Sequence, residues 1–295
     1  MSKNIFSGLE DLGFDDIDGI DLYHTKKEEI EKEELLQLTD EEKQKKLLYD
    51  CEVTCPVCDN DFKARAVKTS AARILKRDSD SFIIFDVINP YFYDVWVCDK
   101  CGYAAMKRDF NKIRDSEIDL VKEKIRPKWQ PRSYPDVYDV NVAIERFKLS
   151  LLNYYVIDAK ASKKAMNCLK LAWMYRILED SENEAVFLRQ ALEGFNYAYF
   201  NEAFPLYNMD KFTSMYIIGE LNRRLGNNDE SLKWFSQVIT THGVSSKLKD
   251  RSRQQRDLIK EAEQLEKGVD ELNNNEVISK EDQKPKKGFF SRFFS

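Results

Sequence analysis

The chain has 295 residues, a net charge of −5 and a pI near 5.4, so it is long enough for one or two domains. The acidic balance disfavours generic binding to a phosphate backbone, and only two histidines occur, which disfavours an acid–base hydrolase. The sequence has no run of about 18 apolar residues, so no transmembrane helix is expected. The N-terminus lacks the apolar segment of a secretory signal. We therefore expect a cytoplasmic protein whose paired thiols hold a metal rather than form disulfides.

Residues 1–48 are acidic and rich in charge. They contain a short apolar and acidic stretch, NIFSGLEDLGF (4–14), followed by a run of alternating charge from 26 to 48. Such a run is typical of a solvated helix or a flexible arm. A dedicated partner-binding arm is the alternative.

Residues 49–115 carry two cysteine pairs, CPVC (55–58) and CDKC (98–101), which lie about forty residues apart. A CxxC turn directs two thiolates at one ion, so two such turns can close a tetrahedron of sulfur. The predicted ligands of a structural Zn2+ ion are Cys55, Cys58, Cys98 and Cys101. Gly102 follows the last thiol, where such a turn often needs a positive φ. Short strands are expected at 62–67 and 93–98, whereas 69–78 is compatible with a helix or an extended segment.

Two other functions of the cysteine pairs remain open. A redox-active dithiol would need one cysteine of low pKa, and a rubredoxin-like site would hold iron. Four thiolates leave no coordination position for water or substrate, so a catalytic zinc is not expected. Cys51 is expected to be an ordinary strand residue, although it could be a spare thiol near the site. Cys168 is expected to lie on an amphipathic helix and to pack in the protein core.

Residues 116–267 consist of successive segments with apolar residues three and four positions apart, which predicts helices. The spacing Met215-x2-Ile218-Gly219-x2-Asn222 with Ser231-x3-Phe235 follows the tetratricopeptide pattern, and a second copy centres on Ala172. We predict a mainly α protein of tetratricopeptide-like helical hairpins with a small zinc-ribbon-like β module near the N-terminus. An irregular helical bundle is the alternative.

In such repeats the inner face of each first helix lines a groove for partner peptides. The residues predicted to bind a protein partner there are Trp173, Arg176, Tyr216, Glu220 and Arg223. Exposed aromatic and arginine side chains are typical of protein-binding surfaces. Core packing is the alternative for Trp173.

The β module also has a basic run followed by aromatic residues: Lys63, Arg65, Lys68, Arg73, Lys76, Arg77, Tyr91, Phe92, Tyr93 and Trp96. Cations on phosphates and rings on bases would suit a nucleic acid. Aspartates interleave with this run and the whole chain is acidic, so nucleic-acid binding is an alternative rather than the expectation.

Residues 268–295 form a polar linker and a basic, phenylalanine-rich tail. The tail residues expected to contact an anionic membrane surface or a protein partner are Phe289, Phe290, Arg292, Phe293 and Phe294. The chain has no glycine-rich phosphate loop, GxSxG elbow or HExxH helix, so an enzyme is not the expectation.

Several motifs occur in the order of a known family: CPVC, INPYFYDVWVCDKCGYAA, AWMYR and GELNRRLGN. Over roughly residues 49–240 the chain resembles the bacterial domain-of-unknown-function family 2225. The resemblance implies a cytosolic protein with a cysteine-knuckle module and a tetratricopeptide-like region, and implies no established activity. Our expectation is a non-enzymatic, zinc-stabilised adaptor that binds a protein partner. The alternatives are a zinc–thiolate redox sensor, in which oxidation ejects the metal, and a nucleic-acid-binding zinc ribbon.

Overall fold

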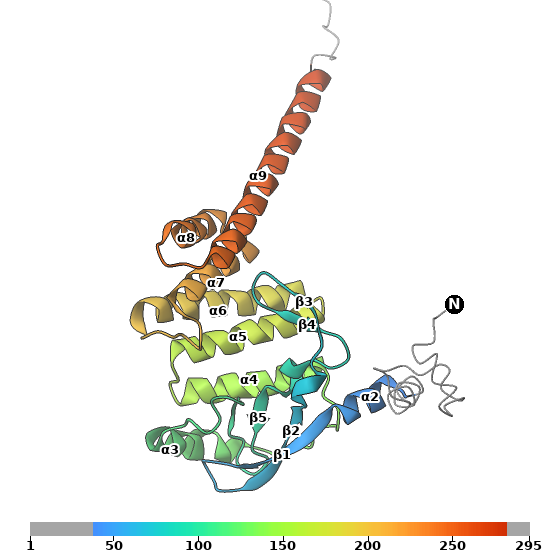
Figure 1. Cartoon of the computed structure of the whole chain (residues 1–295), viewed down its shortest axis with the longest axis vertical. Helices are drawn as coiled ribbons and strands as arrows, with labels where there is room; N and C mark the ends of the chain where they lie inside the picture. The colour runs from blue at the N-terminus through green and yellow to red at the C-terminus, as the bar shows by residue number, and fades with distance from the viewer. Residues whose placement is uncertain (1–37, 282–295) are drawn as a thin grey trace, which may run out of the picture.

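A computed structural model describes residues 38–281, with side chains described up to residue 265 (Figure 1). The N-terminal part is a short helix and three strand pairs, and the remainder is helical. The helices are α2 (Asp40–Lys46), α3 (Asp115–Lys124), α4 (Val140–Val156), α5 (Ala161–Ile177), α6 (Ser181–Asn201), α7 (Lys211–Arg224), α8 (Asn228–Thr240) and α9 (Ser246–Glu281). The strands are β1 (Leu48–Thr54), β2 (Asp61–Val67), β3 (Ile74–Arg77), β4 (Ile83–Phe85), β5 (Val95–Val97) and β6 (Ala104–Met106).

The strands form three separate antiparallel hairpins, β1–β2, β3–β4 and β5–β6. In the first hairpin Leu48 pairs with Val67 and Thr54 pairs with Asp61, and in the third Val95 pairs with Met106. The predicted strand at 62–67 is confirmed. The predicted strand at 93–98 is shorter than expected, because Pro90–Tyr93 forms a 3-10 turn that the Asn89 side chain caps at the backbone N–H of Tyr91.

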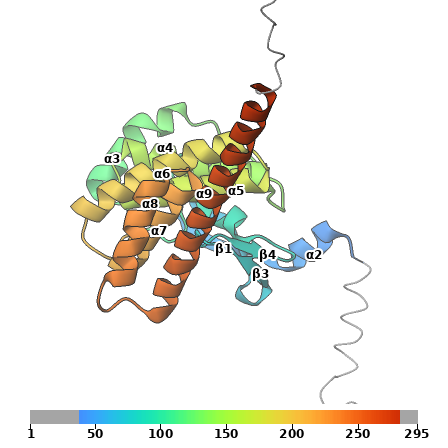
Figure 2. The ribbon, with the colours of Figure 1, turned by 90° about the horizontal axis from the view of Figure 1, so that it is seen from above.

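Helices α4 to α8 stack in chain order along the long axis of the molecule (Figure 1). The β5–β6 hairpin packs against α4 at one end, and α9 runs away from the other end past α7 and α8. Strands β1, β3 and β4 lie to one side of the helical layers when the molecule is seen from above (Figure 2). The expectation of a mainly α protein with a small β module is confirmed.

Two pairs of consecutive helices, α5–α6 and α7–α8, pack as hairpins across short connections. Glycine allows both close contacts, since a Cβ on Gly194 would lie 2.8 Å from the Cβ of Ala165, and one on Gly219 would lie 3.0 Å from Phe235. Gly226 lies directly after the C-cap of α7 and has φ +77°, a conformation that glycine adopts readily at the end of a helix. The interpretation of these hairpins as tetratricopeptide repeats remains a prediction.

One continuous hydrophobic core joins the β module to the helices. It contains three of the four paired cysteines, the β5–β6 hairpin and the inner faces of α4 to α8. A buried hydrogen-bond chain crosses the boundary, because Tyr154 of α4 accepts from the backbone N–H of Met106 at 3.1 Å and donates to Asp109 at 3.1 Å. The β module is thus an integral part of the described fold.

Candidate metal centre

Each cysteine pair forms the turn of a β-hairpin, CPVC between β1 and β2 and CDKC between β5 and β6. The two turns have the same backbone hydrogen bonds. The N–H of the first cysteine donates to the carbonyl five residues on, Cys55 to Asn60 at 2.9 Å and Cys98 to Tyr103 at 2.8 Å. The carbonyl of that cysteine accepts from the N–H four residues on. Both turns therefore present their two sulfurs in the same way.

Both turns end in a residue with positive φ, Asp59 at 55° and Gly102 at 75°. The expectation for Gly102 is confirmed, and the Trp129 ring gives a second reason for glycine. A Cβ on Gly102 would lie 2.7 Å from that ring, while the indole N–H of Trp129 donates to the carbonyl of Asp99 at 2.6 Å. Trp129 thus covers the second turn and requires a residue without a side chain there.

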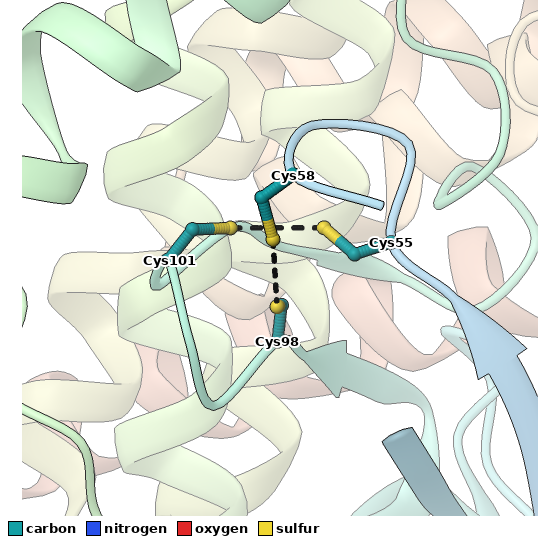
Figure 3. Close-up of side chains that lie close together, drawn as sticks. All are labelled: Cys55, Cys58, Cys98 and Cys101. Carbon is teal, nitrogen blue, oxygen red and sulfur yellow. Dashed lines mark hydrogen bonds between the residues drawn. The ribbon is translucent and has the colours of Figure 1, made fainter. Parts of the chain in front are cut away.

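The four sulfurs converge on one point (Figure 3). All four Sγ atoms lie within 4.8 Å of one another, and the Cys55–Cys101 and Cys58–Cys98 distances are each 3.6 Å. With metal–sulfur bonds of about 2.3 Å, a tetrahedral zinc site places its sulfurs about 3.8 Å apart. The predicted quartet is therefore assembled at a spacing that could hold a metal ion.

The thiols strongly influence one another's protonation. The neighbouring thiols of Cys101 and Cys55, together with the backbone N–H groups of Cys101 and Lys100, hold the pKa of Cys98 well below its usual range. The pKa of Cys101 is raised, chiefly by its hydrogen bond with Cys55. Several thiolates at this spacing repel one another, whereas a bound dication would favour deprotonation of all four.

The cluster is largely closed to solvent. Cys55, Cys98 and Cys101 are fully buried and Cys58 is half-buried. The other two cysteines lie outside the cluster, since Cys51 is in β1 facing Ala64 of β2 and Cys168 is buried in α5. A four-sulfur set with so little access is typical of a structural centre rather than a catalytic one.

The five residues predicted to bind a partner also come together, but around a segment of the chain itself. They are Trp173 and Arg176 on α5, and Tyr216, Glu220 and Arg223 on α7. The loop between β3 and β4, residues 78–82, lies against them. The Asp80 carboxylate accepts from the Trp173 indole at 3.0 Å and from the Arg176 guanidinium at 2.7 Å.

The neighbouring Ser79 completes this contact. Its hydroxyl donates to Glu220 at 2.6 Å, and its carbonyl accepts from the Tyr216 hydroxyl at 3.0 Å and from Arg251 at 2.9 Å. Trp173, Tyr216 and Glu220 are buried as a result. Partner binding by these five residues stays a prediction, and in this structure their polar groups are satisfied within the chain.

Sequence reasoning missed the other half of this cluster, Asp80, Arg224 and Arg251. Asp80 is fully buried, with Arg224 at 3.6 Å. Burial alone would raise the pKa of Asp80, but Arg176 and Arg224 outweigh it and lower the pKa below its ordinary value. A buried aspartate in a short acidic stretch gives no periodic signal in the sequence.

Several cations of the basic run in the β module form ion pairs with aspartates. Arg73 pairs with Asp86 at 3.6 Å, Lys76 with Asp78 at 3.8 Å, and Arg65 with Asp50 at 2.8 Å. The tail residues from Phe289 to Phe294 and the stretch 4–14 lie outside the described residues. Among the helices described, none combines the length and the apolar character that crossing a bilayer requires.

The fold and the cysteine cluster define a mainly helical protein with a four-cysteine knuckle module. Residues 48–259 match the family described as "Uncharacterized protein conserved in bacteria (DUF2225)", and the chain belongs to that family. An uncharacterised protein of Borreliella burgdorferi is 24% identical over 151 residues, which cover 44% of this chain and 53% of that relative. The match thus spans about half the length of the relative. No solved structure matches the chain.

Proposed function

We propose that this chain is a zinc-stabilised interaction protein without catalytic activity. A Zn2+ ion held by Cys55, Cys58, Cys98 and Cys101 would fix the two knuckles, and the helical array would bind a protein partner. Thiolate is a ligand that zinc favours, and the closed cluster leaves no position for a substrate. Iron in the same four-sulfur geometry is the competing metal, and metal analysis separates the two.

The observation that carries the partner-binding proposal is an open groove on the helices. A cavity of about 1040 Å3 runs between α4 and α6 over the N-terminal half of α5. Leu151, Ala165 and Cys168 line this cavity. Tyr155 and Tyr197 also line it, and 75% and 61% of their surfaces are exposed. Aromatic side chains this exposed beside an apolar groove are typical of a binding site for a helix of a partner protein.

This groove differs from the one that the sequence predicts, which the loop 78–82 fills. A partner at the predicted face would have to displace Asp80 and Phe82, which are both buried. The groove beside Tyr155 and Tyr197 needs no such displacement. We therefore assign the partner, an apolar helical segment, to the groove between α4 and α6.

The test compares a variant of the groove with a matched surface variant. A protein captured by the intact chain from lysate of its native cell is identified, purified and titrated against three forms of the chain. The double variant Tyr155→Ser/Tyr197→Ser should bind it at least tenfold more weakly, a loss of about 1.4 kcal/mol or more. The control Tyr49→Ser changes a 43% exposed tyrosine on β1 and should bind normally. Equal affinity for all three forms would rule out this groove.

The second candidate is the zinc–thiolate redox sensor, which one observation favours. Cys58 is the member of the quartet that is only half-buried, so an oxidant could reach its sulfur. Peroxide at low dose should then release zinc from the folded chain, with a dithiol reductant restoring it. Zinc retention at doses that oxidise an ordinary exposed thiol would exclude the sensor.

A further inference from the structure

A second pocket lies between the β module and the segment that leads into α4. Its volume is about 430 Å3, and it takes residues from β1, β2, the second knuckle, the connection 129–138 and α4. This is within the size range of small-molecule sites. Aromatic side chains form part of its wall, among them Phe62, Trp129 and Tyr134. The pocket borders the second knuckle through Asp99 and Trp129 but includes none of the four cysteines, and it shares no lining residue with the groove beside Tyr155.

Arg146 of α4 lines this pocket and carries a buried positive charge. Only 4% of its surface is exposed, and its Nη2 donates to the carbonyl of Val95 at 2.7 Å. Its Nε is buried and has no hydrogen-bond partner among residues 38–281. Within the part of the chain that the structure describes, no carboxylate lies within 4.0 Å of its guanidinium nitrogens. Arginine does not lose its proton in proteins, so this charge needs compensation.

Two tyrosine rings supply part of that compensation. The guanidinium carbon of Arg146 lies 4.7 Å from the ring centres of both Tyr134 and Tyr138. Ring faces stabilise a cation less than an anion does, and they leave the Nε unsatisfied. A buried arginine with these neighbours retains a positive charge and a free N–H donor that an oxyanion could satisfy.

Most of the other charged groups of the pocket have an ionic or hydrogen-bond partner. Arg65 binds Asp50 and lies 3.7 Å from Asp136, and Asp99 accepts from the amide of Asn60 at 3.0 Å. Lys63 also lines the pocket, is exposed, and has no carboxylate partner among the residues that the structure describes. Arg132, the remaining cation of the lining, pairs with Glu145 at 3.1 Å, so Arg146 at the buried side and Lys63 at the surface are the cations available to a ligand.

We propose that this pocket binds a small molecule through an oxyanion, phosphate or carboxylate, which Arg146 holds and Lys63 approaches. The unpartnered Nε–H of the guanidinium can donate to the oxyanion, and the ammonium adds a point charge at the exposed side. The aromatic walls leave room for an apolar or ring-shaped remainder of the ligand. This proposal does not depend on the protein partner proposed for the groove between α4 and α6.

Titration calorimetry on the zinc-loaded full chain tests the proposal, with inorganic phosphate and acetate as separate probes. One of them should bind at a single site, with a dissociation constant on the order of 1 mM or below, because a small anion makes few contacts. The preferred probe identifies which oxyanion the pocket recognises. Binding should weaken as sodium chloride is raised.

The variants Arg146→Lys and Lys63→Met should each weaken this binding at least fivefold. Lys112→Met removes an exposed lysine that does not line the pocket and should leave it unchanged. Arg146 also holds the Val95 carbonyl, so if Arg146→Lys fails to fold, Lys63→Met decides the matter. Absence of saturable binding of both probes, or the same affinity in Lys63→Met as in Lys112→Met, would overturn the proposal.

Discussion

At the scale of single residues, Asp80 connects the β3–β4 loop to two helices. Its carboxylate is fully buried and accepts from Trp173, from Arg176 and from the backbone N–H of Phe82 at 3.2 Å. Such a group stabilises the fold only while it is ionised, because its partners include two guanidinium groups. Removal of one member of a buried ion pair leaves the other charges without compensation.

We predict that Asp80→Asn lowers the free energy of unfolding by about 3 kcal/mol near neutral pH. Because the pKa of Asp80 is lowered in the folded chain, its contribution is fully present above its ordinary pKa of 3.8 and is lost as the pH falls through the lowered value. The difference between wild type and variant should therefore be constant above about pH 5 and shrink below about pH 4. Urea denaturation at each pH measures it.

Asp119→Asn serves as the control, because Asp119 is an exposed residue of α3. Its effect should stay within about 0.5 kcal/mol. A difference between wild type and Asp80→Asn that did not change with pH would contradict the assignment of an ionised, stabilising carboxylate.

Substitutions of Gly102 and Gly226 allow the cost of backbone strain to be distinguished from the cost of a steric clash. Both have positive φ, 75° and 77°, but a Cβ on Gly226 would meet nothing within 4 Å, whereas one on Gly102 would meet Trp129. Gly226→Ala should cost about 1 kcal/mol of stability from strain alone. Gly102→Ala should cost a further 1–3 kcal/mol or so, because Trp129 must move. Equal costs in urea denaturation would show that Trp129 does not cover the knuckle.

At the scale of elements, the α5–α6 contact depends on the pair Gly194 and Ala165. The added Cβ in Gly194→Ala would lie 2.8 Å from that of Ala165, so the helices must separate and stability should fall by about 1–3 kcal/mol. Ala165→Gly in the same chain should recover part of the loss, since it vacates the space. Melting temperatures of the single and double variants measure this. A double variant no more stable than the sum of the two single effects would refute the close contact.

The elements that the sequence predicted well are those with a strong local signal. The helices follow from apolar residues three and four positions apart. The two knuckles were predictable because CxxC spacing determines local geometry. Residues 69–78 could not be assigned, because they divide into a 3-10 turn and a short irregular strand with no periodicity.

The prediction of the partner groove did not include the loop 78–82, which covers that face of α5 and α7. Spacing along α5 and α7 placed Trp173, Arg176, Tyr216 and Glu220 on one face, and the structure brings them together. What covers that face is a tertiary contact between residues 96 positions apart, Asp80 and Arg176. Helical periodicity carries no information about such a distant segment, so only the three-dimensional structure reveals it.

At the scale of the whole molecule, the cysteine cluster lies inside a core that continues into the helices. Cys55, Cys98 and Cys101 belong to the same hydrophobic cluster as Phe147 of α4 and Leu169 of α5. The β5–β6 hairpin that carries one knuckle also packs on α4. Removal of the proposed metal ion should therefore weaken the junction between module and helices as well as the two turns.

The metal content of the chain purified without added metal tests the central claim most directly. Elemental analysis should find one zinc ion per wild-type chain and one per Cys168→Ser, whose thiol is buried in α5 away from the cluster. Cys98→Ser should hold far less, because one of four ligands is lost. Zinc at one equivalent in Cys98→Ser, or no metal bound by the wild-type chain, would contradict a four-cysteine zinc centre.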